Sequence, residues 1–515
     1  MNARVRDRLA ERIPAPEPVA PAPTRTPKVA VVGAGIAGLS AARALTERGV
    51  EVEVLEREEG WGGRLRGWET RLADGSTVTM SRGFHAFFRQ YYNLRDLLAH
   101  ADPDLSGLVP LTDYPLAHVS GAADRFSGLP RTPPWNAFAL AATSRSFTLR
   151  ALADVNVPAA LRLLDVEVPD VYRRLDHLSA RDLLETVRFP PDARHLAFEV
   201  FGRSFFAAPE DLSAAEMAVM FHIYFLGSSE GLVFDVPRSP FPQALWDPLV
   251  ERLSGAGARF RRKARVERIV PSAEAEGATV HWTGPEGDRS ARFDGVVLAT
   301  EPGGLRRLVA DSPALGDEEW RSRASASPSA PPFLVSRYWL DRPVRPHRQA
   351  FLGTAGHPTL DNVSVLERYE DESAAWSRRT GGSVVELHAY ALPQGCDLAT
   401  ERASLWKQAL SVYPELRSAR IVDARHELRE DCSLFPPGGF ERRCAVATPD
   451  PWLVVAGDHV RVDLPVALME RAATTGVLAA NALLTRWGRR GHAVWSVPRR
   501  GRFAPLRALS GLLSG

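Results

Sequence analysis

The stretch that most constrains the fold is KVAVVGAGIAGLSAARALTERGVEVEVLERE, from Lys28 to Glu58. It begins with a short apolar run at 29–32, continues through a glycine turn into an Ala- and Leu-rich helical segment, and ends with an alternating run at 50–55. A strand, a glycine turn, a helix and a second strand in this order form the βαβ unit that binds dinucleotides. We therefore predict an α/β fold that begins with such a unit.

The three glycines of the turn, Gly33, Gly35 and Gly38, serve different physical purposes. The first permits a tight turn, the second lets the backbone approach a pyrophosphate at the helix N-terminus, and the third lets the helix pack closely on the strand. Ile36 and Ala37 stand in the first turn of the helix, where backbone N–H groups have no partner within the helix. We expect all five residues to contact the cofactor.

Glu56 closes the second strand, eighteen residues after Gly38. At this position a carboxylate accepts hydrogen bonds from an adenosine ribose. The same charge would repel a 2′-phosphate, which argues against NADP. No second GxGxxG motif follows a later strand, so the sequence gives no evidence of a nicotinamide site and leaves the electron acceptor open.

At 515 residues the chain is longer than one hydrophobic core usually supports, so we expect two domains. Its 64 Lys and Arg residues nearly balance its 62 Asp and Glu residues, which gives no reason to expect nucleic acid as a partner. The 3 cysteines form no CxxC pair, so the sequence predicts neither a disulfide framework nor a metal site. These features fit a protein of the reducing cytoplasm.

The two ends of the chain differ from the rest in composition. Residues 1–27 are rich in proline and lack an apolar stretch, so we predict a disordered leader. Residues 486–515 carry seven Arg and no acidic residue, with Trp and Leu side chains among the cations. Such a segment is typical either of a solvated tail or of a foot on an anionic membrane surface. No run of about twenty apolar residues occurs, so we expect any membrane contact to be peripheral.

A second glycine motif indicates which dinucleotide is bound. The segment GWGGRLRGW places Gly62, Gly63 and Arg64 directly after the second strand. It resembles the glycine pair and Arg of the flavin amine oxidase and carotene desaturase superfamily. The resemblance implies that the pair lies against the FAD diphosphate and that the Arg lies near the flavin. Taken alone, the segment is also typical of an ordinary glycine turn.

Two distant segments resemble the same superfamily. KARVERIV followed by DGVVLAT resembles its returning strands, which places Val266 near the adenine. WLVVAGDHV puts Gly457 and Asp458 after an apolar strand, and a helical segment follows from Ala467. In the superfamily these parts hold the ribityl chain and the flavin, so the resemblance implies one discontinuous FAD domain. The residues expected to bind FAD are Gly33, Gly35, Ile36, Ala37, Gly38, Glu56, Arg57, Gly62, Gly63, Arg64, Gly83, Phe84, His85, Val266, Gly457, Asp458 and Ala467.

Between these segments the chain changes character. Residues 99–245 carry apolar side chains at helical spacing, and later runs alternate like strands. We predict a Rossmann-like discontinuous FAD-binding domain, an antiparallel-sheet substrate domain and a helical cap, which enclose a pocket for a large apolar molecule. The predicted boundaries are 28–98, 246–310 and 431–485 for the FAD-binding domain, 99–245 for the cap, 311–430 for the substrate sheet and 486–515 for a basic amphipathic tail.

The stretch RGFHAFFRQYYNLR, at 82–95, is unusually rich in aromatic residues. Its rings stand at spacings of three, four, seven and eight residues, which is typical of one face of a helix. Such a face packs in a core or walls a cofactor pocket, and the spacing leaves both interpretations open. The rings are Phe84, Phe87, Phe88, Tyr91 and Tyr92.

The span from Val29 to about Leu484 resembles the carotenoid φ-ring synthases, or isorenieratene synthases. The aromatic stretch and the motifs GLVFDVP, LFPPG and PVALMERAATTG carry the resemblance. These FAD enzymes make the β-ionone end rings of carotenoids such as β-carotene aromatic, so the resemblance implies a carotenoid substrate and an aromatic product. One departure is Ser81, where such enzymes usually have Asp near the flavin.

The implied reaction requires two two-electron oxidations of each ring and the migration of one methyl group. A flavin can take each hydride, and the allylic cation that is left can drive the methyl shift. Aromatic faces stabilise such a cation by about 0.5 to 2 kcal/mol each when desolvated. The residues predicted to contact the substrate are Phe87, Phe88, Tyr91, Tyr92 and His222, and those predicted to move protons are His85, Glu230, Asp431 and Glu470.

Two other functions fit the same sequence. One is another FAD-dependent carotenoid desaturase or isomerase, or a χ-ring synthase, which would differ only in the shape of its pocket. The other is a flavin-holding carotenoid carrier without redox turnover. The sequence does not separate φ from χ products. In each case we expect a cytoplasmic protein that is attached peripherally to a membrane surface.

Overall fold

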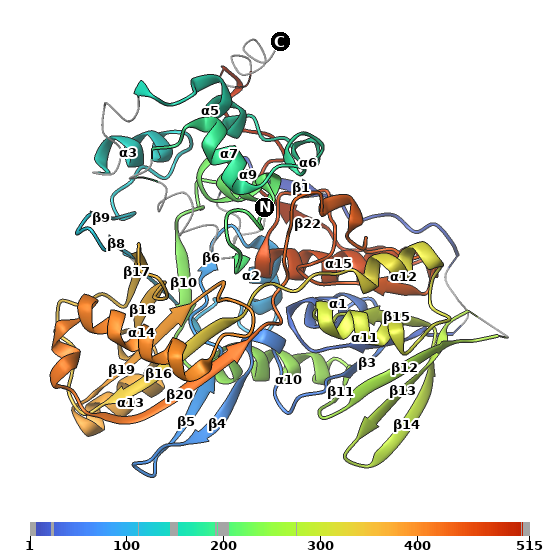
Figure 1. Ribbon diagram of the computed structural model, residues 1–515. Helices are drawn as coiled ribbons and strands as arrows, with labels where there is room; N and C mark the ends of the chain where they lie inside the picture. The colour runs from blue at the N-terminus through green and yellow to red at the C-terminus, as the bar shows by residue number, and fades with distance from the viewer. Residues whose placement is uncertain are drawn as a thin grey trace.

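The computed structural model describes residues 7–21, 25–111, 113–144, 153–190, 193, 205–273, 276–505 and 507. Figure 1 shows a parallel sheet with its helices on one side of the molecule, a large mixed sheet on the other side, and a group of short helices above both. Among the helices of this described part, none has the length and hydrophobicity needed to cross a lipid bilayer.

The parallel sheet contains five strands from three separate parts of the chain. All neighbouring pairs are parallel, and the interior strands β2 and β15 are apolar and almost fully buried. This arrangement confirms the predicted α/β fold with a discontinuous Rossmann-like sheet. In order across the sheet, the strands are β11 (Arg259–Arg261), β3 (Glu51–Leu55), β2 (Lys28–Val32), β15 (Gly295–Leu298) and β21 (Leu453–Val455).

Helices cover both faces of the parallel sheet. On one face, α1 (Ile36–Thr46) packs closely against α15 (Leu468–Arg486). Gly476 allows this close approach, since a Cβ at this position would lie only 2.3 Å from the carbonyl oxygen of Ala37. The opposite face is covered by a three-stranded antiparallel sheet and two helices. These elements are β12 (Arg265–Pro271), β13 (Ala278–Gly284), β14 (Gly287–Phe293), α11 (Pro302–Ala310) and α12 (Glu318–Ser325).

The mixed sheet contains seven strands, and every neighbouring pair is antiparallel except β17 with β8. Strands β8 and β9 lie within residues 99–245, so part of the range predicted as the cap belongs to this sheet. In order, the strands are β20 (Ile421–Arg429), β16 (Phe333–Leu340), β19 (Ser383–Ala389), β18 (Asn362–Val365), β17 (Phe351–Ala355), β8 (Leu116–His118) and β9 (Ala123–Asp124). Helices α13 (Asp371–Thr380) and α14 (Leu398–Val412) and the hairpin β4 (Gly67–Arg71) to β5 (Thr77–Ser81) complete this half.

The cap consists of short helices above the two sheets (Figure 1). Its apolar helix α9 (Ala214–Phe221) is capped by Ser213, which accepts a hydrogen bond from the N–H of Ala215, and continues as a π-helical turn, η4 (His222–Leu226). Within the range predicted as the cap, residues 194–204 lie outside the described part of the chain. The described cap helices are α3 (Trp135–Thr143), α5 (Val157–Leu164), α6 (Asp170–Leu175), α7 (Ala180–Val187), α9 (Ala214–Phe221) and η4 (His222–Leu226).

The aromatic stretch is not the helix that its spacing predicts. Phe87–Phe88 form strand β6, which pairs with β10 (Phe234–Pro237) in a small sheet completed by β7 (Leu108–Pro110), and helix α2 begins only at Tyr92–Leu98. Spacings of four and eight are even numbers, so they also suit one face of a strand. The hydrogen-bonded pairing with β10, which lies far away in the sequence, selects the strand over the helix.

The disordered leader predicted for residues 1–27 is wrong for the described residues 7–21. Strand β1 (Glu11–Ile13) pairs with β22 (Val494–Ser496) near the other end of the chain. Asp7 is buried and bonded to Arg502, with an Nη1–Oδ2 distance of 2.7 Å. The two ends of the described chain therefore pack against each other. The local composition of either end does not predict this long-range pairing.

The basic tail is likewise ordered up to residue 505. Three of its arginines form ion pairs with other parts of the chain: Arg490 with Glu17, Arg499 with Glu11, and Arg500 with Glu167. Residues 508–515 lie outside the described part of the chain. The described tail is therefore part of the folded body, and its arginines do not form the free cationic foot that the sequence suggested.

Candidate active site

A cavity of about 400 Å³ lies where the carboxyl ends of β2, β3 and β15 meet the mixed sheet. One end is lined by the glycine turn and its neighbours, and the other end by a ring of aromatic side chains. The carboxyl ends of parallel strands are where such folds bind their ligands. The two halves are continuous, so a cofactor and an apolar substrate can meet in one space.

The N-terminus of α1 opens into this cavity without a cap. Gly35 is its N-cap residue, no side chain bonds to its first N–H groups, and no acidic residue stands in its first turn. A Cβ on Gly35 would meet only the Cα of Gly63, at 3.7 Å, so the glycine leaves space on the cavity side. Free N–H groups and a helix dipole at such a point suit a diphosphate.

Glu56 lies at the end of β3 and lines the cavity beside this helix. Its two carboxylate oxygens accept the N–H of Ala34, at 2.7 Å, and the N–H of Glu58, at 2.9 Å. Burial raises the pKa of Glu56, and these two N–H donors lower it in part. The bonds fix the carboxylate in place, where its remaining lone pairs suit the hydroxyls of a ribose.

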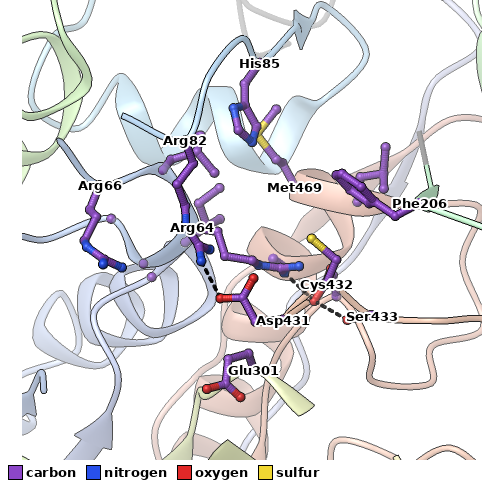
Figure 2. Close-up of a pocket in the computed structure, with 18 of the residues that line it drawn as sticks. Arg64, Arg66, Arg82, His85, Phe206, Glu301, Asp431, Cys432, Ser433 and Met469 are labelled. Carbon is purple, nitrogen blue, oxygen red and sulfur yellow. Dashed lines mark hydrogen bonds and ion pairs between the residues drawn. The ribbon is translucent and has the colours of Figure 1, made fainter. Parts of the chain in front are cut away.

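Two partly buried ion pairs line the middle of the cavity, and Figure 2 shows Arg64, Arg82 and Asp431 close together there. Arg64 bonds to Asp458, with an Nη2–Oδ1 distance of 2.7 Å, and the hydroxyl of Ser433 donates to the same oxygen at 3.0 Å. Arg82 bonds to Asp431, at 2.5 Å. Burial would raise the pKa of Asp458, but the charge of Arg64 lowers it far below its usual range. Both carboxylates are therefore held ionised beside fixed cations.

The cavity wall also contains buried oxygen atoms without a hydrogen-bond partner among the described residues. They are the Oγ1 atom of Thr300, the Oδ1 atom of Asn362 and the Oδ1 atom of Asp431. Buried polar atoms are nearly always bonded, so their lack of a partner indicates a polar ligand. Together with the glycine turn and Glu56, the atoms of Thr300 and Asp431 fit a dinucleotide.

Most residues that the sequence predicted for the cofactor line this cavity. The three exceptions are Gly38, Gly83 and Ala467, which are not among the described lining residues. A Cβ on Gly38 would lie 1.9 Å from the Gly33 oxygen, and a Cβ on Gly83 would lie 2.5 Å from His388, so both glycines allow close packing. Ala467 is the N-cap residue of α15. The predicted residues that line the cavity are Gly33, Gly35, Ile36, Ala37, Glu56, Arg57, Gly62, Gly63, Arg64, Phe84, His85, Val266, Gly457 and Asp458.

The other half of the cavity is aromatic. The ring of Phe84 stacks on Phe351, with 4.3 Å between centroids, and Phe88 lies 4.6 Å from Tyr224 and 5.2 Å from Phe234. Sequence analysis predicted Phe88 and Tyr91 here but missed most of the wall. The aromatic lining residues that were not predicted are Tyr114, Phe126, Phe205, Phe206, Phe234, Phe333, Phe351, Tyr390 and Phe435. Two of them, Phe234 and Phe435, stand in the motifs GLVFDVP and LFPPG, which was the available signal.

Three residues predicted to contact the substrate are not among the described residues that line the cavity. Side chains alternate along a strand, so Phe87 points into the core when Phe88 points to the cavity. Tyr92 begins α2, and its hydroxyl faces Ser228. His222 is buried in the cap and bonded through Nε2 to the carbonyl oxygen of Pro498, at 2.6 Å.

Of the four residues predicted to move protons, two are among the described lining residues of the cavity and two are not. Glu470 caps α2 by accepting the N–H groups of Asn93 and Leu94, both at 2.9 Å, and burial raises its pKa to about 8. Glu230 accepts the N–H of Asp7. Neither is among the described lining residues, and both accept hydrogen bonds from backbone N–H groups within the protein.

His85 and Asp431 do line the cavity. Burial lowers the pKa of His85 to about 4, and its Nδ1 atom lies 2.9 Å from the carbonyl oxygen of Gly83. Burial would raise the pKa of Asp431, but the neighbouring Arg82 cation lowers it. Both groups are in place to contact a ligand.

A group of polar residues on β18, on β19 and directly after β19 was not predicted from the sequence. His388, Tyr390 and Asn362 line the aromatic half of the cavity, and Glu386 stands directly behind His388. The signal was present in VVELHAYAL, where Glu386, His388 and Tyr390 alternate with apolar residues in the manner of one strand face.

Comparison with known proteins agrees with this geometry. A family model described as flavin containing amine oxidoreductase matches residues 36–484. The chain is 58% identical over 507 residues to a carotenoid phi-ring synthase of Streptomyces griseus, across 98% of this chain and 97% of that protein. It is 25% identical to a carotenoid phi-ring synthase of Chlorobaculum tepidum, across 97% of this chain and 93% of that protein.

The fold also matches solved structures. A double mutant of putrescine oxidase superimposes with a TM-score of 0.64 at 17% sequence identity, over 90% of this chain and 100% of that chain. The family match and the glycine turn that fits a dinucleotide make FAD the cofactor of this protein. The chain belongs to the family of flavin containing amine oxidoreductases.

Proposed function

We propose that this protein converts the β-ionone rings of a carotenoid, such as β-carotene, to aromatic φ-rings by desaturation coupled to a 1,2-methyl shift. The observation that carries the proposal is the single cavity that joins a dinucleotide site to an aromatic chamber. Two relatives that match this chain over nearly its whole length bear the name carotenoid phi-ring synthase. The reaction removes two hydrides and two protons from each ring.

FAD supplies the hydride acceptor, and the residues of the chain do the rest. Phe84, Phe88 and Phe351 form apolar walls that hold the ring and exclude water. Their faces also attract the positive charge that hydride removal leaves on the ring. Arg64 and Arg82 are held by carboxylates at the middle of the cavity, so their charges face the cofactor end and are partly neutralised there.

The product test is direct. Purified protein, or cells that express it and produce β-carotene, should yield isorenieratene on chromatography. A product with χ-rings, or a carotenoid that is desaturated without a methyl shift, would instead support the related FAD-dependent carotenoid enzymes. A flavin-holding carrier would leave β-carotene unchanged and its flavin oxidised under anaerobic conditions.

We predict that replacing Phe84 or Phe88 with leucine slows hydride transfer while FAD stays bound. Leucine keeps the wall apolar but removes a face that stabilises the ring cation. Loss of one desolvated contact of about 1 to 2 kcal/mol lowers the rate by roughly five- to thirty-fold. The measurement is anaerobic flavin reduction by β-carotene, normalised to bound FAD.

Phe87→Leu is the matched control for these variants. Phe87 is adjacent in the sequence but buried in the core away from the cavity. It should lower the melting temperature and leave flavin reduction per bound FAD unchanged. Normal reduction in both Phe84→Leu and Phe88→Leu would contradict the proposed role of the aromatic wall.

We also propose that the protein takes its substrate from a membrane surface, through the cap. Trp135 and Phe138 on α3 are exposed by 58% and 50%, although they are large apolar side chains. The same helix is bonded to η4 through Asn136 and the carbonyl of Phe225, and Phe225 packs on Phe126 in the cavity wall. Exposed aromatic rings near such a cavity suit insertion into a lipid interface.

The double variant Trp135→Glu and Phe138→Glu is therefore expected to bind anionic liposomes several-fold more weakly than the parent protein. The measurement is co-sedimentation with the vesicles, with FAD content as a check on folding. Val270→Glu is the control, because Val270 is also an exposed apolar residue, at 37%, but lies on β12 at the other end of the molecule. Equal binding by the double variant and the parent would exclude this surface.

A further inference from the structure

A chain of buried polar contacts runs from the core of the mixed sheet to the aromatic half of the cavity. It starts at Arg337 on β16, whose Nη2 atom lies 2.8 Å from an oxygen of Glu386 on β19. The other oxygen of Glu386 lies 2.9 Å from Nε2 of His388. The Nδ1 atom of His388 lies 2.7 Å from the hydroxyl of Tyr390, to which the Nδ2 group of Asn362 donates at 3.2 Å.

The direction of the hydrogen bonds follows from the chemistry of the groups. Burial would raise the pKa of Glu386, but the charge of Arg337 lowers it to about 2, so its carboxylate only accepts. The Nε2 atom of His388 therefore carries a hydrogen and donates to Glu386, and in the neutral form of the ring Nδ1 accepts. The hydroxyl of Tyr390 donates to that Nδ1 atom, which leaves a lone pair of the Tyr390 oxygen for a group in the cavity.

We propose that Tyr390 is the catalytic base that removes the ring proton, and that His388 is the group that receives the proton of Tyr390 in turn. This inference rests on the proposed function, which leaves the proton acceptor unassigned. Glu386 and Arg337 act as positioning residues, because they fix the tautomer of His388 and do not line the cavity themselves among its described residues.

The step balances in atoms and charge. The ring cation gives a proton to the oxygen of Tyr390, and the electron pair of the broken C–H bond becomes a π pair of the ring. The original hydroxyl proton of Tyr390 moves to Nδ1 of His388. Tyr390 is again a neutral phenol, and the positive charge now rests on His388, directly beside the carboxylate of Glu386.

The surroundings of Tyr390 suit a relay better than a free phenolate. Burial raises the pKa of Tyr390 above its usual value, so its hydroxyl is protonated at rest. Its ring is fixed edge-on to Phe206, with 4.9 Å between centroids, in the wall of the same cavity. The arrangement of carboxylate, imidazole and hydroxyl is the one that activates a hydroxyl in general base catalysis.

His85 is the other histidine on the cavity wall, but its surroundings make it a weak base. Its Nδ1 atom faces the carbonyl oxygen of Gly83, and burial lowers its pKa to about 4. His388 instead has a carboxylate beside it, with 2.9 Å between its Nε2 atom and an oxygen of Glu386. The two histidines therefore differ in the partner that would compensate a positive charge.

The test uses Tyr390→Phe and His388→Gln in the full-length protein with FAD bound. In both variants the initial rate of anaerobic flavin reduction by β-carotene should stay within about a factor of two of the parent, while aromatic product in β-carotene-producing cells falls by at least about 100-fold. Tyr338→Phe is the control, because Tyr338 is a buried tyrosine on the neighbouring strand β16 and is not among the described lining residues. It should match the parent in both measurements.

Three results separate the possibilities. Normal aromatic product from Tyr390→Phe would overturn the inference. An equal loss of flavin reduction and product, with FAD content and melting temperature unchanged, would place Tyr390 in substrate binding and would also overturn it. Absence of flavin reduction in the parent protein would instead count against the proposed function itself.

Discussion

Replacing Gly35 with valine is expected to give a folded protein that contains no FAD. Gly35 has φ of −78° and ψ of −177°, a conformation that valine adopts without strain. A Cβ there would meet no described atom closer than the Cα of Gly63, at 3.7 Å. The polypeptide therefore accepts the side chain, but the branched methyl groups fill the space that the FAD diphosphate needs at the N-terminus of α1.

The measurement is the flavin absorbance of the purified protein per chain, together with circular dichroism. Gly255→Val is the matched control, since Gly255 lies in α10 (Asp247–Gly255) and a Cβ there meets nothing within 4 Å. This control should keep its FAD. One FAD per chain in Gly35→Val would show that the diphosphate does not lie at this turn.

A different glycine of the same motif should fail differently. A Cβ on Gly38 would lie 1.9 Å from the carbonyl oxygen of Gly33, which is shorter than any tolerated contact. Gly38→Ala should therefore disturb the packing of α1 itself, and thermal stability should fall together with FAD content. The contrast between Gly35 and Gly38 distinguishes loss of the ligand from loss of the fold.

The FAD half of the site was predictable because its information is local. Gly33, Gly35 and Glu56 stand at fixed distances along one strand, helix and strand, and each has a separate physical purpose. The later segments at Val266 and Asp458 were found by resemblance to a superfamily. The structure then brings all of them to the carboxyl edge of one sheet.

The aromatic half could not be predicted in this way, because its residues come from many separate segments. Phe126 lies in the loop after β9, Phe234 in β10 and Phe351 in β17, and each alone has the sequence signature of a core residue. Only the long-range pairing of strands brings them together. Phe87 lies three residues after Phe84, a spacing that shares one face in a helix but not in a strand, so the strand pairing with β10 is what separates Phe87 from the cavity wall.

The ends of the chain show a related limit. Proline-rich composition suggested disorder for the leader, and clustered arginines suggested a membrane foot for the tail. In the structure, β1 pairs with β22 and Asp7 bonds to Arg502, so each segment supplies hydrogen-bond and charge partners to the other. The composition of a segment does not show whether a segment far away in the sequence will pair with it.

The second large effect is expected at Glu216, a fully buried residue of α9 that joins the cap to the FAD-binding half. Its carboxylate bonds to Arg443 and to Arg471 on α15, the latter at 2.8 Å, and accepts the hydroxyl of Tyr172 at 3.2 Å. Glu216→Ala leaves two buried guanidinium groups without compensation. Breaking a buried pair from one side costs about 3 to 5 kcal/mol, so the variant should be strongly destabilised.

Glu210→Ala is the control for this prediction, because Glu210 pairs with Arg181 at the surface, where the two side chains are 49% and 54% exposed. A surface pair of this kind contributes little to stability. Urea unfolding of the FAD-loaded protein gives the comparison, with fluorescence and flavin release as two probes. Equal stability of Glu216→Ala and the parent would show that the two arginines find other partners.

The same carboxylate predicts an acid dependence of stability. Burial would raise the pKa of Glu216, but the charges of Arg471 and Arg443 lower it from 4.5 to about 2. A carboxyl with a depressed folded-state pKa stabilises the protein above its unfolded pKa and loses this contribution as the pH falls toward the folded value. The stability difference between the parent and Glu216→Ala should therefore be full above about pH 5 and shrink steadily as the pH falls toward 2. A difference that stays constant over this range would mean that Glu216 acts through packing and not through its charge.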